Sequence, residues 1–387
     1  MADEAKSAAI DAWLSHVFSA GDEALLLSMY ADTLKPHHEA RLDMLLWRNA
    51  KADSERMLPR VSAGWKKLAA ARQALRDNRS GVDTLVEAVP KALKDHPGLM
   101  FERMQWRARK GRNEGAVEIF LGQSADALGE PARWAGWRRS LARSEMRAGR
   151  TDVAYRLAAD HGLESGSHFA DLEWLAGYLA LTYKKDGATA LQHFLRFRGA
   201  VETPISLGRA GYWEGRAHDL IGDEEAARLA YLFGAEFQTS FYGLLAAEHA
   251  GLPMTANLAA PVPASDIGNA GFRESSVFEA AQLMLAAGQV TLAERFLTHL
   301  TETLPEADVA RLGAWVLEQG EPHIAVMIGK RAARRGIVVP FAYYPLADLG
   351  VMENPVSDEL ALAIARRESE FDPNVTSHAG AKGLMQV

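Results

Sequence analysis

The sequence predicts an all-α fold in which helical hairpins stack into a superhelix. Alanine, leucine, arginine and glutamate dominate the 387 residues, prolines are few and scattered, and runs of β-branched residues are rare. This composition favours helix over strand. A second observation agrees with it: a unit of an apolar helix, a short turn with glycine, and a second helix rich in small residues recurs along the chain.

The recurring unit predicts six helical hairpins. Their turn glycines are Gly111, Gly149, Gly187, Gly222, Gly288 and Gly320. These glycines follow one another at intervals of about 35 residues, except that the interval from Gly222 to Gly288 is about twice as long. An interval of about 35 is close to the period of tetratricopeptide-like helical repeats. Glycine ends the first helix of each hairpin in a left-handed cap. Because one hairpin cannot bury its apolar face alone, neighbouring hairpins stack. An irregular helical bundle with a chance period is the alternative.

Two proline-containing segments predict the domain boundaries. Residues 251–276 and 338–359 each contain three prolines and interrupt the helical pattern. We therefore expect a superhelical repeat domain at 1–250, further helical repeats with a linker at 251–345, and a separate C-terminal domain at 346–387.

Composition also excludes several classes of function. A formal net charge of −7 argues against a nucleic-acid partner. The absence of cysteine removes disulfides, thiol nucleophiles and thiolate metal sites, and we expect neither a metal nor a cofactor.

No apolar run reaches about 18 residues, so no membrane span is expected. The N-terminus lacks the pattern of a secretory signal. We expect a monomer.

The helix predicted at the C-terminal end carries the candidate catalytic residue. Ser357 is the expected N-cap, and Pro373 is expected to stop the helix soon after Phe371. At about 100° per residue, Glu368 falls on one apolar side of the helix, which consists of Leu360, Ile364, Phe371, Ala361 and Ala365. On this pattern the apolar side of the helix is buried, and Glu370 and Arg366 lie on the opposite side.

Burial of Glu368 implies a chemical role. A carboxyl group on a buried face loses solvation in its charged form, which raises its pKa. A raised pKa suits a general acid at neutral pH. The alternative is a glutamate at the margin of the apolar face that is exposed or paired with its neighbour Arg367.

The stretch after this helix predicts a turn and a strand. Ser377 is followed by Gly380 and Gly383, and glycines permit a tight turn where backbone approaches a ligand. The residues "GLMQV" at 383–387 look like the first strand of a small sheet. An acid on a helix, a turn and then a strand that lines a cleft is the arrangement of lysozyme-like glycosidases.

These residues resemble the signature of the soluble lytic murein transglycosylase family, E-S-x-F-x-P-x-A-x-S-x-x-G-A-x-G-L-M-Q. The matching residues are Glu368, Ser369, Phe371, Pro373, Ser377, Gly380, Ala381, Gly383, Leu384, Met385 and Gln386. Val375 stands where the family often has alanine. The segment "SFYGLLAAEHAG" at 240–251 also resembles a stretch of the family's helical region, and a superhelix ahead of a lysozyme-like α+β domain is the family's architecture.

The resemblance implies a peptidoglycan lytic transglycosylase. The bond cleaved would be the β-1,4 link from N-acetylmuramic acid (MurNAc) to N-acetylglucosamine (GlcNAc), with Glu368 as general acid and then base and a 1,6-anhydro-MurNAc end as product. The acetamido group of the substrate would replace a second carboxylate. Ser377, Gly380, Met385 and Gln386 would bind the substrate, and the partner would be peptidoglycan glycan strands in the periplasm.

The resemblance also implies that residues 346–387 are an incomplete lysozyme-like domain, since the later motifs of the family are missing. We therefore expect this chain to be a C-terminally truncated, inactive fragment of an active protein, with its signal peptide upstream or removed. A non-catalytic helical-repeat scaffold that binds a protein or a glycan is the alternative function.

Two other features have structural explanations. Trp134 and Trp137 could form a sugar-stacking platform, but packing between helices is the favoured interpretation. The basic cluster of Lys330, Arg331, Arg334 and Arg335 ends a helix, where cations suit the helix dipole. A solvated face is favoured for it over contact with anionic cell-wall groups.

Overall fold

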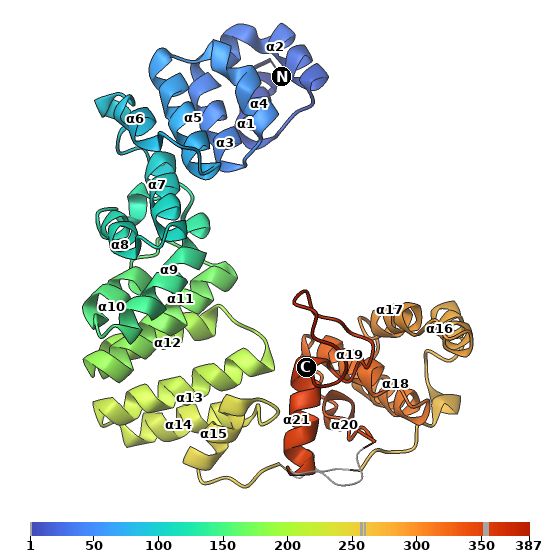
Figure 1. The fold of residues 1–387 in the computed structure, drawn as a ribbon. Helices are drawn as coiled ribbons and strands as arrows, with labels where there is room; N and C mark the ends of the chain where they lie inside the picture. The colour runs from blue at the N-terminus through green and yellow to red at the C-terminus, as the bar shows by residue number, and fades with distance from the viewer. Residues whose placement is uncertain (1, 256–257, 259–260, 351–355) are drawn as a thin grey trace. The chain divides into compact units, whose positions relative to one another are not determined.

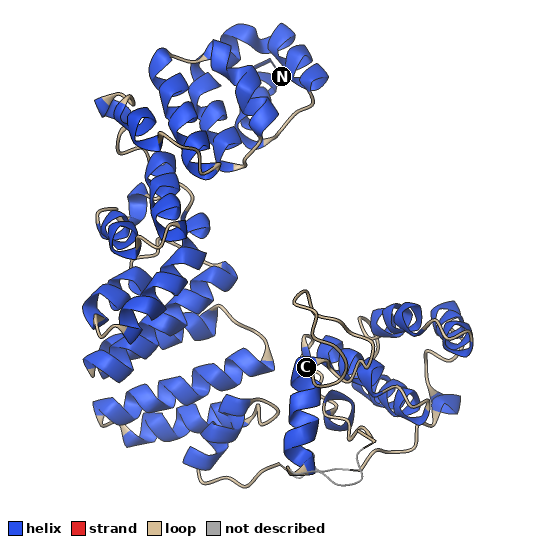
Figure 2. Ribbon diagram, viewed as in Figure 1, coloured by secondary structure: helices blue, strands red, loops and turns tan. Residues whose placement is uncertain are grey.

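The computed structural model describes residues 2–255, 258, 261–350 and 356–387 (Figure 1). Helices form nearly all of its regular structure, and the described ranges contain no strand (Figure 2). A single isolated bridge joins Thr376 to Lys382. The prediction of an all-α helical-repeat fold is confirmed.

The chain divides into two compact units, residues 1–200 and 201–387. The three-part division at 250 and 345 stays a prediction. No helix in the described part of the chain is both long enough and apolar enough to span a membrane.

The first unit consists of short helices joined by tight turns. Its α-helices are α1 (Ala2–Ser15), α2 (Ala20–Leu34), α3 (His38–Trp47), α4 (Lys51–Met57), α5 (Ala63–Arg76), α6 (Val82–Glu87), α7 (Pro97–Arg109), α8 (Asn113–Leu121), α9 (Pro131–Arg147), α10 (Thr151–Ala159), α11 (Gly166–Leu179) and α12 (Gly187–Gly199). Short 3₁₀ turns lie at Lys35–His37, Leu58–Arg60, Lys91–Leu93 and Ala125–Ala127, and a π-helical turn lies at Ala180–Lys184.

The second unit contains the remaining helices. They are α13 (Pro204–Ile221), α14 (Glu224–Ala235), α15 (Phe241–His249), α16 (Ser276–Ala286), α17 (Val290–Leu300), α18 (Glu306–Glu318), α19 (Pro322–Ala333), α20 (Pro340–Tyr343) and α21 (Asp358–Glu368), with a 3₁₀ turn at Ile267–Asn269. Between α15 and α16 the described residues are turns and loop, as the proline pattern predicts. Residues 256–257 and 259–260 of that stretch lie outside the described residues.

All six predicted hairpins are present. They pair α7 with α8, α9 with α10, α11 with α12, α13 with α14, α16 with α17, and α18 with α19. In five of them the predicted glycine has a positive φ, between 71° and 88°. The exception is Gly187, which begins α12, while Lys185 takes the left-handed conformation with φ 57°. The π-helical turn before Lys185 shifts the reversal ahead of the glycine.

The core of the first unit is built from large apolar side chains between neighbouring hairpins. Trp134 is fully buried, its Nε1 donates to the Leu128 carbonyl at 3.0 Å, and its ring packs edge-on against Phe101 and Phe120. Trp137 packs against the same core. The packing role predicted for these two tryptophans is confirmed.

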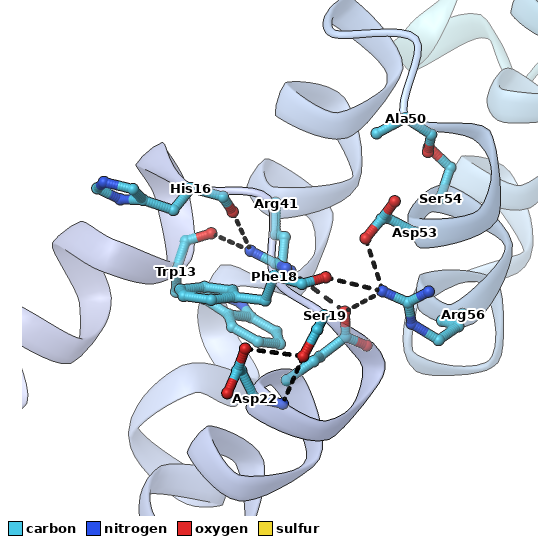
Figure 3. A network of polar contacts seen from close by, with 11 residues as sticks. Trp13, His16, Phe18, Ser19, Asp22, Arg41, Ala50, Asp53, Ser54 and Arg56 are labelled. Atoms are coloured by element: carbon cyan, nitrogen blue, oxygen red, sulfur yellow. Dashed lines mark hydrogen bonds and ion pairs between the residues drawn. The ribbon is translucent and has the colours of Figure 1, made fainter.

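A buried ionic network joins the first four helices (Figure 3). The Arg41 guanidinium is fully buried, donates to the carbonyls of Trp13 at 2.6 Å and His16 at 3.1 Å, and lies 3.9 Å from the Trp13 ring centroid. Glu23 lies 3.4 Å from Arg41 and 3.2 Å from Arg56. Because a buried charge is costly without partners, this mutual pairing makes the burial possible.

A second buried network centres on Glu173 of α11. Its carboxylate lies 3.2 Å from His161 Nε2, 2.5 Å from His193 Nδ1 and 3.0 Å from Arg196 Nε. Burial raises the pKa of Glu173, but hydrogen bonds from these three side chains outweigh burial and lower the pKa to about 2. The network ties α12 to α11 through charge as well as packing.

Close backbone contact positions α20 in the second unit. A Cβ on Gly329 of α19 would lie 2.8 Å from the Cα of Tyr343, so only glycine allows α20 to approach this closely. Ala342 packs in the same way over Gly313 of α18. The apolar core of α16–α20 includes Phe278 and Trp315. This core fixes α19 and Tyr343, which together hold α21.

Candidate active site

Helix α21 begins as the sequence predicts. The Ser357 Oγ accepts a hydrogen bond from the Leu360 backbone N–H at 3.4 Å. Asp358 and Glu359 lie in the first turn, where the helix dipole favours negative charge. The helix that carries Glu368 therefore starts at a defined position.

The predicted buried side of α21 is confirmed for Ala361, Ala365 and Phe371 and wrong for Leu360, Ile364 and Glu368. The buried residues are Ala361 and Ala365, whereas Leu360 and Ile364 are 50% and 40% exposed. Glu368 lies on the same side as Leu360 and Ile364, as predicted, but that side faces solvent. Small alanines let α21 approach its neighbours closely, which a leucine stripe would prevent. The burial expected for Glu368 is therefore absent.

Arg366 anchors the buried side of α21. Its Nε donates to the Tyr343 carbonyl at 2.8 Å, and its guanidinium lies 4.7 Å and 4.3 Å from the ring centroids of Tyr343 and Tyr344. The sequence predicts that Arg366 lies on the side away from the protein. This prediction is wrong because the helix packs through the side that carries Ala361 and Ala365. Cation–π contacts and a hydrogen bond to α20 orient α21 instead.

The helix ends at Glu368, earlier than the predicted stop after Phe371. Glu370 and Phe371 both take left-handed backbone conformations, with φ 55° and 65°. Phe371 is nevertheless 3% exposed and packs with Ala365 and with Val326 of α19. Glu370, predicted to face solvent, is half-buried and pairs with Lys330. The turn after Glu368 is thus held against α19.

The predicted strand at 383–387 is wrong, because residues 383–386 form a turn. Gly380 and Gly383 have φ 91° and 70°, so the prediction of glycine-dependent turns is confirmed. The Ser377 N–H donates to the Ala381 carbonyl at 2.9 Å, and the Ser377 Oγ accepts from the Ala381 N–H at 3.1 Å. Ser377 therefore closes the loop that contains Gly380.

Gln386 and Met385 hold the end of this loop. The Gln386 Nε2 donates to the carbonyls of Val375 at 3.1 Å and Gly383 at 2.9 Å. Met385 packs with the cluster around Phe371. The Ser369 Oγ lies 2.8 Å from the Leu384 carbonyl and so connects the end of α21 to the loop. The loop residues and the end of the helix form one connected unit.

Glu368 has no hydrogen-bond or ion-pair partner among the residues that the structure describes. The alternative in which Arg367 neutralises it is therefore not observed. An exposed, unpaired carboxyl group beside an ordered loop is accessible to a ligand. No cluster of metal-ligating side chains occurs in the described ranges.

The basic cluster at the end of α19 is solvated as predicted, since Arg334 and Arg335 are exposed and the Lys330 and Arg331 side chains are 38% and 41% exposed, but three of its members also make contacts within the protein. Lys330 pairs with Glu370, and Arg331 lies 3.5 Å from Glu302. Arg335 donates to the carbonyls of Thr301 and Leu304 at 2.6 and 2.8 Å. These contacts tie α19 to its neighbours.

The C-terminal segment matches a known family. The model of the family described as Transglycosylase SLT domain matches residues 351–387. The match agrees with the resemblance of the residues after Glu368 to the lytic transglycosylase signature. A search of curated proteins gave no match.

The fold of the chain also resembles solved structures. Lytic transglycosylase Slt from Pseudomonas aeruginosa, solved as an inactive mutant, has a TM-score of 0.65 at 16% identity, covering 100% of this chain and 62% of that one. The 70 kDa soluble lytic transglycosylase of Escherichia coli has a TM-score of 0.38 at 13% identity, covering 99% and 74%. A 70 kDa soluble lytic transglycosylase bound to bulgecin A has a TM-score of 0.39 at 14% identity, covering 99% and 74%. The first of these shows a shared fold, and the chain spans 62% of that protein's length.

Several residues that shape the candidate site were not predicted. Ser369 belongs to the motif, but its bond to the Leu384 carbonyl has no sequence signature. His323 and Lys330 approach the turn from α19, 47 and 40 residues before Glu370 in the chain. Only the packing of α21 on α19 brings them there.

Proposed function

We propose that residues 357–387 form part of the active site of a peptidoglycan lytic transglycosylase. The observation that carries the proposal is Glu368, an exposed and unpaired carboxyl group at the end of α21, beside a loop that Ser369 connects to it. The match of 351–387 to the Transglycosylase SLT domain supports this assignment. The P. aeruginosa Slt of known structure was inactivated by replacing a glutamate with glutamine, which supports a glutamate as the essential residue.

The proposed reaction uses Glu368 twice. Its carboxylic acid donates a proton to the oxygen that leaves with GlcNAc as the bond to C1 of MurNAc breaks. The 2-acetamido oxygen of MurNAc stabilises the positive charge at C1, so no second carboxylate is required. The Glu368 carboxylate then takes the proton of the MurNAc 6-hydroxyl, whose oxygen bonds to C1 and closes the 1,6-anhydro ring.

The loop residues are assigned to substrate binding in this proposal. The Ser377 Oγ already accepts from the Ala381 N–H, and none of the described residues accepts its proton, which leaves that proton available to a substrate oxygen. Gly380 offers backbone without a side chain, and apart from its chain neighbours no atom lies within 4 Å of the position a Cβ would take. Met385 and Gln386 complete this side of the site, and the expected location is the periplasm, where the substrate lies.

Product chemistry tests the proposal. Because the chain spans 62% of the P. aeruginosa Slt structure, residues 357–387 are grafted into the matching segment of that enzyme and assayed beside the chain itself. The graft should release 1,6-anhydro ends from purified peptidoglycan, and these should stay unlabelled in water enriched in heavy oxygen. Labelled reducing ends would mean hydrolysis and would contradict the proposal. Absence of any cleavage would favour the helical scaffold function.

A further inference from the structure

The backbone immediately after Glu368 is strained. Glu370 and Phe371 are consecutive non-glycine residues with φ 55° and 65°. This region brings Cβ close to the following carbonyl, and such conformations persist only where the surrounding structure enforces them. The position of Glu368 therefore depends on whatever holds the two residues that follow Ser369.

One stripe of α19 supplies this support. His323, Val326 and Lys330 are spaced at i, i+3 and i+7, so they lie on one side of the helix. The His323 Nδ1 donates to the Glu370 carbonyl at 2.9 Å, Val326 packs against Phe371, and Lys330 pairs with the Glu370 carboxylate. The backbone of the strained turn receives a direct hydrogen bond from His323.

The second nitrogen of His323 faces another acceptor. Its Nε2 lies 3.5 Å from the Glu294 Oε2 of α17. A neutral imidazole carries one N–H, whereas an imidazolium carries two. Because both ring nitrogens of His323 face oxygens that only accept, the imidazolium is the form that satisfies both contacts.

We propose that His323 is a positioning residue that, as an imidazolium, bridges Glu294 of α17 to the Glu370 carbonyl and so holds the turn that fixes Glu368. That His323 fixes the turn is inferred from the contacts of α17, α19 and the turn alone. Its consequence for catalysis rests on the proposed function.

The charges around His323 agree with this form. Burial lowers the pKa of His323, but the contacts with Glu294 and the Glu370 carbonyl, together with the charge of Asp372, outweigh burial and raise the pKa. Burial raises the pKa of Glu321, the residue before α19, and the charge of His323 offsets only part of that rise. Lys330, also directed at the turn, is neutralised by Glu370.

The sign of the pH dependence follows. A histidine whose pKa is raised on folding stabilises the folded arrangement fully below its unfolded value of about 6.5. That contribution disappears as pH rises through the raised folded value. The turn should therefore be held most firmly in mildly acidic solution and loosen in alkaline solution.

Hydrogen exchange on the full 387-residue chain tests the inference, with rates corrected for the intrinsic effect of pH. At about pH 6, below the ordinary pKa of histidine, peptides that span 366–374 should exchange several-fold faster in H323A than in the wild type. In the wild type the same peptides should lose protection toward alkaline pH, and E294Q should move that loss to lower pH. In H323N, which cannot titrate, exchange should no longer depend on pH.

The matched control is H299N, which changes an exposed histidine on α17 whose one ion pair among the described residues is with Glu302. It should exchange like the wild type. Equal protection of 366–374 in H323A and the wild type at pH near 6 would overturn the inference, as would coincident pH profiles of E294Q or H323N with the wild type. If the exchange rates of the variants are as expected but the graft does not cleave peptidoglycan, the proposed function is rejected. The role of His323 in the turn then still holds.

Discussion

The carboxylate of Glu23 in the first unit is enclosed between Arg41 and Arg56, whereas that of Glu368 in the second unit has no partner among the described residues. Glu23 lies in the first turn of α2, where the helix dipole favours an anion, and Glu368 lies at the last residue of α21, where it does not. Glu23 is buried, and Glu368 is exposed.

Under the proposed function, glutamate serves two purposes in this chain. A buried carboxylate such as Glu23 requires neighbours that satisfy it, so its contacts are part of the fold. An exposed carboxyl group such as Glu368 contributes little to the fold and is free to react. The following experiments test whether buried, paired charges stabilise the fold more than exposed ones do.

The largest expected loss of stability is at Glu23. Replacing it with glutamine leaves the fully buried Arg41 guanidinium without its counter-ion, which should destabilise the α1–α4 region by about 3 kcal/mol. Chemical denaturation, with hydrogen exchange to locate the effect, measures this. E55Q changes an exposed glutamate of α4 and is the control. A stability unchanged by E23Q would show that Glu23 is not structural.

Acid should act next most strongly, through Glu173. Because its folded pKa of about 2 lies below the ordinary value of 4.5, its contribution is complete above 4.5 and is lost as pH falls toward 2. Hydrogen exchange of α11 and α12 should therefore accelerate across that window in the wild type. In E173Q the acceleration should be weaker. Identical acid profiles of the two proteins would contradict the network described for Glu173.

The smallest expected effect is at Lys330. Its pair with Glu370 is partly exposed, so K330M should cost less than about 1 kcal/mol in global stability. The change should appear as faster exchange confined to 369–372, because that turn is strained. R331M, which removes a pair with Glu302 instead, should leave the turn unaffected. A loss of several kcal/mol from K330M would mean that the turn is part of the core.

The fold was predictable where local chemistry decides it. Glycine ends five of the six predicted hairpin turns in the left-handed conformation, and Ser357 caps α21 as a small hydroxyl residue should. Gly187 shows the limit of this reasoning, because a π-helical turn moves the reversal to Lys185.

The site was less predictable because tertiary packing decides its orientation. The helical period predicts that Glu368 lies on the same side as Leu360 and Ile364, but it does not determine which side of the helix is buried. Alanine at 361 and 365 lets α21 approach its neighbours, and Arg366 fixes the rotation through Tyr343 and Tyr344. The strand expected at 383–387 fails for a related reason, since the bonds of Gln386 to nearby carbonyls fold that stretch into a turn.

The central claim is that Glu368 is the acid and base of the reaction, and the rate of peptidoglycan cleavage by the graft tests it most directly. E368Q should lower that rate by about 10²–10⁴-fold, the usual contribution of general acid–base catalysis, with an unchanged melting temperature. E359Q, at an exposed glutamate in the first turn of the same helix, should cleave at the parent rate. Cleavage by E368Q at the rate of the parent would contradict the account.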